Sequence, residues 1–177
     1  MEKNYKDIEI FNKNLSNLKE TSKDTDSATV EYMTESETEV VNFDAVKKMY
    51  VKGMELTGTP CSTDALYIDT SSNFYFIEFK NGKMSQNKIY NVYNKIYDSL
   101  LIFNDIISEN ISFCREHVNF ILVYNESKNP KVEIGEYFAG KAKKKFVRFN
   151  LEQFEKIYFK NVYTCTEQEF KEKFSFV

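Results

Sequence analysis

The chain has 177 residues, a length that suits one domain with a substantial buried core. Hydrophobic residues make up 42% of it and aromatic residues 16%, all of them Phe or Tyr, as is typical of a packed globule. The net charge of −3 argues against a protein that coats nucleic acid regardless of sequence, and no apolar run reaches the length of a membrane span.

The cysteines and the first residues indicate where the protein works. The chain has an odd number of cysteines, and their spacing is not that of a metal site. We therefore interpret Cys61, Cys114 and Cys165 as reduced thiols. The segment Met1–Lys6 lacks the apolar core of a signal peptide. Together these features predict a cytoplasmic protein with no membrane segment.

The first 27 residues predict a helix followed by a linker. Apolar residues recur at intervals of three and four from Tyr5 to Leu18, which indicates an amphipathic helix. Residues 21–27 are all polar and form the best candidate for a linker. We therefore expect residues 1–27 to form an N-terminal helix and linker, and residues 28–177 to form a single domain.

A second helix is predicted to begin at a capping box. Ser36 and Glu39 have the required spacing, with a serine at the cap and a glutamate three residues later. The helix should end between Gly53 and Gly58. Its inward-facing residues would be Val40, Phe43, Val46, Tyr50 and Met54.

The next segment, Asp64–Lys80, reads as a β-hairpin. The runs 64–69 and 73–80 are strongly apolar and are separated by a short polar break. The second run has apolar residues on both of its faces, which indicates a strand in the middle of a sheet.

Helices and strands continue to alternate after the hairpin. A long amphipathic helix is predicted over about 85–109, and the wholly apolar run 118–124 predicts a buried strand. The later elements are predicted as a strand at 145–149, a helix at 151–157, a strand at 161–165 and a helix at 166–174 that opens with a second capping box.

These elements define the expected fold. Their order is α-β-β-α-β, and a mixed central sheet of three or four strands flanked by helices would bury every apolar face. We therefore assign the chain to the mixed α/β (α+β) class.

The most informative residues lie along the hairpin. Glu78 and Lys80 are two apart on one strand, so their side chains point to the same face. Charged groups at the end of a buried strand need partners, and Asp64 begins the neighbouring strand. Two carboxylates that converge with a lysine offer what a hard divalent cation and a phosphate require.

This arrangement resembles the PD-(D/E)xK nuclease superfamily. Asp64, a variable gap and then Glu78-Phe-Lys80 are similar to its core hairpin. Gln86 and Tyr90 at the start of the following helix resemble the Gln-x-x-x-Tyr motif of the RecB-like branch. The resemblance extends over about 39–124 and implies a restriction-endonuclease-like fold.

The resemblance also implies an activity, namely metal-dependent hydrolysis of phosphodiester bonds in DNA or RNA. Asp64, Glu78 and the backbone carbonyl of Phe79 would hold Mg²⁺ or Mn²⁺. Lys80 would orient the attacking water and stabilise the transition state, and Gln86 with Tyr90 would line the cleft.

A third carboxylate ligand is common in the superfamily, and Glu39 is the first candidate. Glu39 also completes the capping box, and this structural role would equally account for it. Glu35 and Glu55 are the alternatives.

The implied partner is nucleic acid, DNA in preference to RNA, and a homodimer or a protein partner is also open. Phosphate contacts would come from Lys80, Lys83 and Lys88, or from the basic run of Lys141, Lys143, Lys144, Lys145 and Arg148, which could equally be a solvated loop.

Two other classes of function compete with catalysis. One is a catalytically silent binding protein with the nuclease fold, of the immunity, antitoxin or anti-defence type. The other is a structural subunit in which the Glu-x-Lys triplet occurs by chance.

Overall fold

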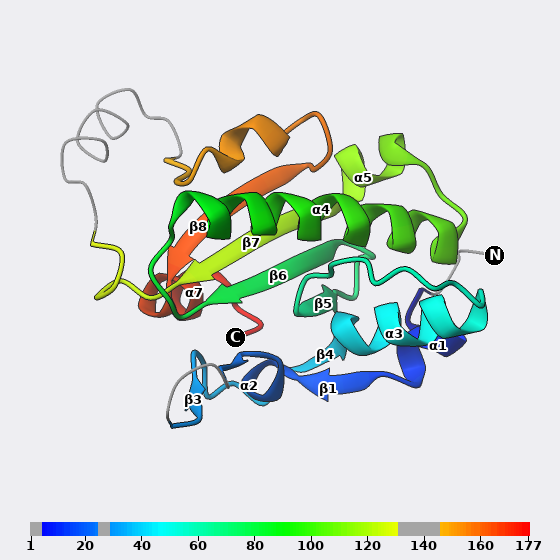
Figure 1. Ribbon diagram of the computed structural model, residues 1–177, viewed down its shortest axis with the longest axis horizontal. Helices are drawn as coiled ribbons and strands as arrows, with labels where there is room; N and C mark the ends of the chain where they lie inside the picture. The colour runs from blue at the N-terminus through cyan, green and yellow to red at the C-terminus, as the bar shows by residue number, and fades with distance from the viewer. Residues whose placement is uncertain (1–4, 25–28, 131–145) are drawn as a thin grey trace.

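The computed structural model describes residues 5–24, 29–130 and 146–177. A six-stranded mixed sheet with the strand order β1-β4-β5-β6-β7-β8 forms its centre, and helices flank it (Figure 1). The strands are β1 (Leu15–Asn17), β4 (Glu39–Asn42), β5 (Ala65–Ile68), β6 (Phe74–Lys80), β7 (Val118–Tyr124) and β8 (Asn161–Thr166). The predicted mixed α/β class is confirmed, and the sheet has more strands than predicted.

Neighbouring strands run antiparallel from β1 to β6 and parallel from β6 to β8. Two further short strands, β2 (Lys23–Asp24) and β3 (Glu31–Tyr32), pair with each other outside the main sheet. The helical elements are η1 (Tyr5–Asp7), α1 (Glu9–Asn12), α2 (Leu18–Thr21), α3 (Phe43–Gly53), α4 (Gln86–Ile107), α5 (Ile111–His117), η2 (Leu151–Phe154) and α7 (Glu167–Lys173).

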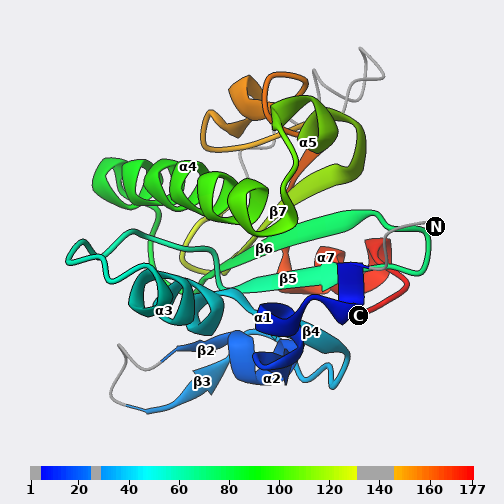
Figure 2. The same ribbon diagram turned by 90° about the vertical axis from the view of Figure 1, so that its right-hand side faces the viewer.

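Two apolar layers enclose the sheet. On one face, Phe76, Leu122 and their neighbours pack against α3, α4 and α5, and Figure 2 shows α4 and α5 together on that side. On the other face, Ile77 and Val123 pack against Phe170 of α7. β7 is buried along its whole length because both of its faces are covered.

The order α3-β5-β6-α4-β7 confirms the predicted α-β-β-α-β sequence of elements. β5 and β6 pair in the predicted hairpin, and α4 begins at the predicted place with the Ser85 side chain as its cap. The capping box formed by Thr166 and Glu169 at the start of α7 is also confirmed.

Two predicted helices near the N-terminus are wrong in their bounds. Leu15–Asn17 is a strand that pairs with β4, so the predicted helix from Tyr5 to Leu18 is divided into short pieces. The β-branched Val40 and Val41 lie in β4, and α3 begins only at Phe43, where Asn42 caps it by accepting a hydrogen bond from the Ala45 N–H.

The predicted C-terminal elements also need correction. Phe146–Phe149, the described part of the strand predicted at 145–149, is not a strand, and residues 151–157 contain only the 3₁₀ turn η2. The cysteines Cys61, Cys114 and Cys165 are all free thiols, as predicted.

Candidate active site

Asp64 and Glu78 face each other across the β5–β6 hairpin. The register pairs Ala65 with Ile77, and the Asp64 N–H donates to the Ile77 carbonyl at 3.2 Å, which places Asp64 opposite Glu78. Because side chains alternate along a strand, both carboxylates point to the face that α4 covers. The Glu78 side chain has no solvent exposure and that of Asp64 has 17%. The predicted convergence of these carboxylates is present.

A third residue, Lys95 of α4, lies between the two carboxylates. Its Nζ is 3.1 Å from Asp64 Oδ1 and 2.8 and 3.0 Å from the two carboxylate oxygens of Glu78. Its side chain is only 17% exposed. Lys95 was not among the predicted site residues. The available signal was a charged residue on the inner face of a predicted amphipathic helix, next to Val92 and Ile96.

Lys80 approaches Glu78 from its own strand. Lys80 Nζ lies 2.6 Å from Glu78 Oε1, and the Lys80 side chain is 15% exposed. Within the described part of the chain, Glu78 Oε1 has no hydrogen bond of normal geometry, although the ammonium nitrogens of Lys80 and Lys95 both lie within ion-pair distance. This buried oxygen therefore already faces two cations.

The backbone of Phe79 also faces the site. Its N–H donates to Asp64 Oδ2 at 2.7 Å. In a strand the N–H and C=O of one residue point the same way, so the Phe79 carbonyl is also directed past the beginning of β5, to the side of Asp64. Phe79 thus remains a candidate backbone ligand, as the resemblance implied.

Burial and the neighbouring charges shift the pKa values of Asp64 and Lys95 strongly. Burial raises the pKa of Asp64 from 3.8 to about 7, and the negative charge of Glu78 adds to the rise, while Lys95 and Lys80 oppose it. Burial alone would lower the pKa of Lys95, but attraction to Glu78 and then Asp64 outweighs burial and raises it. Lys95 is therefore an ammonium ion at neutral pH.

Hydrogen bonds from α4 fix the segment that leads into β5. The Ser99 hydroxyl oxygen accepts from the Thr63 N–H at 2.9 Å, and the Asp98 carboxylate accepts from the Cys61 N–H at 2.7 Å. Since Asp98 and Ser99 follow Lys95 on the same helix, these bonds hold Asp64 at a set distance from the Lys95 ammonium.

A cleft of about 170 Å³ opens beside the carboxylates at the end of β6. Asn81 forms part of its wall and donates to Asp24 of β2 at 2.8 Å and to Glu31 of β3 at 2.6 Å, so the β2–β3 pair is fastened to the site. The residues that line the cleft are Thr21, Ser22, Lys23, Asp24, Met33, Asp64, Phe79, Lys80, Asn81, Gly82 and Lys88.

Gln86 and Tyr90 lie on the other side of α4 from this site. Successive residues of an α-helix are rotated by about 100° around its axis, so the side chains of Gln86 and Tyr90 point about 180° and about 140° away from that of Lys95. Both are exposed, and the Tyr90 ring packs edge-on against Tyr93 at 5.8 Å. The expectation that this pair lines the cleft is therefore wrong, because the helix directs Lys95 toward the carboxylates and the exposed Lys88 toward the cleft.

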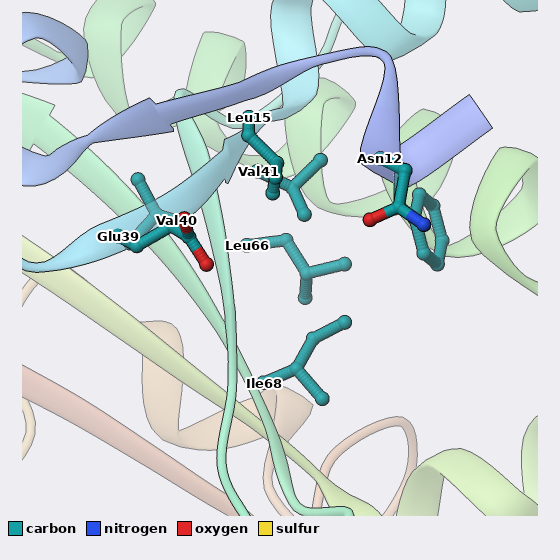
Figure 3. A pocket seen from close by; sticks show the side chains of 8 residues that line it. Asn12, Leu15, Glu39, Val40, Val41, Leu66 and Ile68 are labelled. Carbon is teal, nitrogen blue, oxygen red and sulfur yellow. The ribbon is translucent and has the colours of Figure 1, made fainter. Parts of the chain in front are cut away.

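Glu39 lies too far along the sheet to join Asp64 and Glu78. The register of β4 with β5 puts Glu39 level with Ile68, four residues beyond Asp64, or about 13 Å at the rise of a strand. Glu39 is exposed and lies beside a small apolar pocket that includes Leu66 and Ile68 (Figure 3). The proposed ligand role of Glu39 does not fit this placement.

The two alternative third carboxylates are also exposed. Glu35 pairs with Lys19 at 2.7 Å, and Glu55 follows the end of α3. Among the described residues, no group of three or more His, Cys, Asp or Glu side chains gathers as a metal site would require. Within the described ranges, the candidate metal ligands are therefore Asp64, Glu78 and the backbone oxygen of Phe79.

The predicted basic patch is described only at Arg148. Its guanidinium donates to the carbonyls of Asn129 and Pro130 and lies over the rings of Tyr124 and Phe149, so it has a structural role. The other members, Lys141, Lys143, Lys144 and Lys145, lie outside the described residues.

Comparison with known proteins gives no relative. No protein-family model, curated protein or solved structure matches the chain. In the described ranges, no helix is both long and apolar enough to cross a membrane.

Proposed function

We propose that the protein is a metal-dependent phosphodiesterase of the nuclease type, with a restriction-endonuclease-like core. The observation that carries this proposal is that Asp64 and Glu78, on adjacent strands, both contact a single cation position. In the structure the Lys95 ammonium fills that position, at 2.8–3.1 Å from the carboxylate oxygens. Such a convergence of buried carboxylates is costly and calls for a function.

The donor set fits Mg²⁺ or Mn²⁺. These ions prefer carboxylate and carbonyl oxygens, which Asp64, Glu78 and the Phe79 backbone would supply. Both ammonium groups that now contact Glu78 Oε1, at 2.6 and 2.8 Å, show that this buried oxygen attracts positive charge. A bound divalent cation would polarise a phosphate oxygen and lower the pKa of a coordinated water.

The other residues supply positive charge and orientation. Lys80 would hold the attacking water and stabilise the negative charge that develops on the phosphate. Lys23 and Lys88 line the cleft next to Asp64 and would bind flanking phosphates of the nucleic acid. A DNA or RNA backbone is therefore the substrate class that we propose.

The test is a titration of Mg²⁺ and Mn²⁺ against labelled single-stranded and double-stranded DNA and RNA. We expect cleavage of at least one substrate, loss of cleavage and of Mn²⁺ binding in Glu78→Gln, and loss of cleavage with Mn²⁺ binding retained in Lys80→Met. Gln86→Ala is the matched control and should cleave normally. Absence of cleavage in the folded wild-type protein with every substrate and both metals would overturn the proposal.

A second candidate is a catalytically silent binding protein with the same fold. It is favoured by the fact that Lys80 and Lys95 already balance the charges of both carboxylates. Apolar side chains are also exposed on the outer face of α4, where Tyr90 is 55%, Tyr97 41% and Leu101 70% exposed. Failure of Mn²⁺ to bind the wild-type protein, together with loss of a protein partner in Leu101→Glu, would favour this candidate.

A further inference from the structure

The Lys95 ammonium contacts the same oxygen atoms that a divalent cation would bind. Its Nζ contacts Asp64 Oδ1 and both oxygens of Glu78, all within 3.1 Å. A hard cation at these oxygens would lie at about 2.0–2.6 Å from them. The ammonium and the metal ion would thus compete for one small cation-binding position between the two carboxylates.

The fold places Lys95 at this position. Lys95 lies on the inner face of α4 between Val92 and Ile96, which are both fully buried. The Ser99–Thr63 hydrogen bond keeps this part of α4 against the lead-in to β5. The packing of α4 therefore fixes Lys95 at the site, whereas a surface lysine would be free to move away from it.

Lys80 differs from Lys95 in its contacts. The Lys80 ammonium forms an ion pair with Glu78 Oε1 and approaches along β6, so it lies beside the shared position. Loss of Lys95 from the carboxylates would leave Lys80 in place. The two lysines would then have separate roles, one next to the reacting phosphate and one as an occupant of the cation position.

A cleft next to the carboxylates could accept the Lys95 side chain if a metal ion displaced it. The cleft lined by Asp64, Lys80 and Lys88 adjoins the carboxylates, and the Lys95 side chain retains some exposure. Swinging its flexible stem toward this cleft would move the ammonium into a more hydrated place.

We propose that Lys95 is a tethered cation that occupies the divalent-cation position, so that a metal ion binds Asp64 and Glu78 only by displacing the Lys95 ammonium. This inference rests on the proposed function for the metal ligands, but it concerns metal affinity and does not require that any nucleic acid is cleaved. Lys95 acts through the two carboxylates and is a positioning residue.

The first test measures Mn²⁺ binding by calorimetry and by the electron paramagnetic resonance signal of free Mn²⁺. Lys95→Met should bind Mn²⁺ at least about tenfold more tightly than the wild-type protein, because it removes the competitor. Lys48→Met removes an exposed positive charge on α3, outside the lining of this cleft, and should change the affinity by less than about threefold. Glu78→Gln combined with Lys95→Met should abolish the gain.

A second measurement uses the wild-type protein, because Lys95→Met leaves two buried carboxylates without a partner and could fail to fold. Amine acetylation followed by mass spectrometry should find Lys95 protected in the metal-free protein and labelled when Mg²⁺ is saturating, while Lys88 is labelled in both states. Equal or weaker Mn²⁺ binding by folded Lys95→Met, or equal protection of Lys95 with and without metal, would overturn the inference. Displacement of Lys95 without cleavage of any substrate would refute the proposed function alone.

Discussion

Asp64→Asn should gain stability relative to the wild type as the pH rises from about 4.5 to 8. Burial and the charge of Glu78 raise the pKa of Asp64 in the folded state to about 7, above the ordinary value of 3.8. The folded protein therefore binds more protons than the unfolded chain between these two values. The stability that depends on Asp64 is complete below pH 3.8 and is lost as the pH rises through about 7.

The size of this effect follows from the same two values. The difference between a folded-state pKa of about 7 and an unfolded-state pKa of 3.8 corresponds to ~4 kcal/mol of unfolding free energy. This is an upper value, because the ionisation of Asp64 is coupled to the charge of Lys95. An asparagine at residue 64 can still accept the Phe79 N–H, but its amide would face the Lys95 ammonium. That contact costs stability at every pH, so the slope with pH is the quantity to compare.

The assay is urea unfolding of both proteins at about pH 4.5, 6 and 8, followed by circular dichroism. The wild type should lose stability relative to Asp64→Asn as the pH rises, and Glu20→Gln, which removes an exposed carboxylate, should follow the wild-type profile. Parallel profiles for the wild type and Asp64→Asn, or a wild type that gains on the variant toward high pH, would refute the reasoning.

Three more predictions concern α4. Ser99→Ala should lower the unfolding free energy by about 1–3 kcal/mol, because the buried Thr63 N–H loses its acceptor; urea unfolding checks this, and an unchanged midpoint would contradict it. Phe103→Ala should cost about 3–5 kcal/mol in the same assay, since its ring is fully buried, whereas Leu101→Ala, at 70% exposure, should cost less than about 0.5 kcal/mol. Gln86→Ala should change stability by less than about 0.5 kcal/mol and leave any cleavage rate unaltered, and a slower rate would return Gln86 to the site.

The sequence predicted the centre of the fold well because its signals there are local. The runs of β5, β6 and β7 are almost wholly apolar, and α4 has a clear amphipathic period with a serine cap. Asp64 and Glu78 could be brought together because a hairpin fixes which residues face each other.

The errors arose where long-range pairing decides the structure. Leu15–Asn17 has helical periodicity with its neighbours, but β4 recruits it as a strand. Ser36 and Glu39 have the spacing of a capping box, yet the helix begins later at the Asn42 cap. Sequence patterns cannot show that a distant strand competes for the same backbone hydrogen bonds.

The site was incomplete for a related reason. The Gln86–Tyr90 spacing resembles a family motif, but the pair lies on the outer face of α4. Counting turns from the apolar stripe would have put Lys95, and neither of those residues, beside the hairpin. The helical period of α4 therefore indicates Lys95, whereas the family pattern indicates residues on the opposite face.

The edge position of β1 has a consequence for how the protein avoids self-association. We predicted a boundary after residue 27, and β1 lies on the N-terminal side of it while forming the outer strand of the central sheet. β1 is only three residues long, so it presents little free backbone to another molecule. A shortened chain that begins after the boundary would instead expose the hydrogen-bonding edge of β4, with the apolar Val40 and Val41 beside it. The N-terminal segment thus acts as a cover for a strand edge that would otherwise invite pairing between molecules.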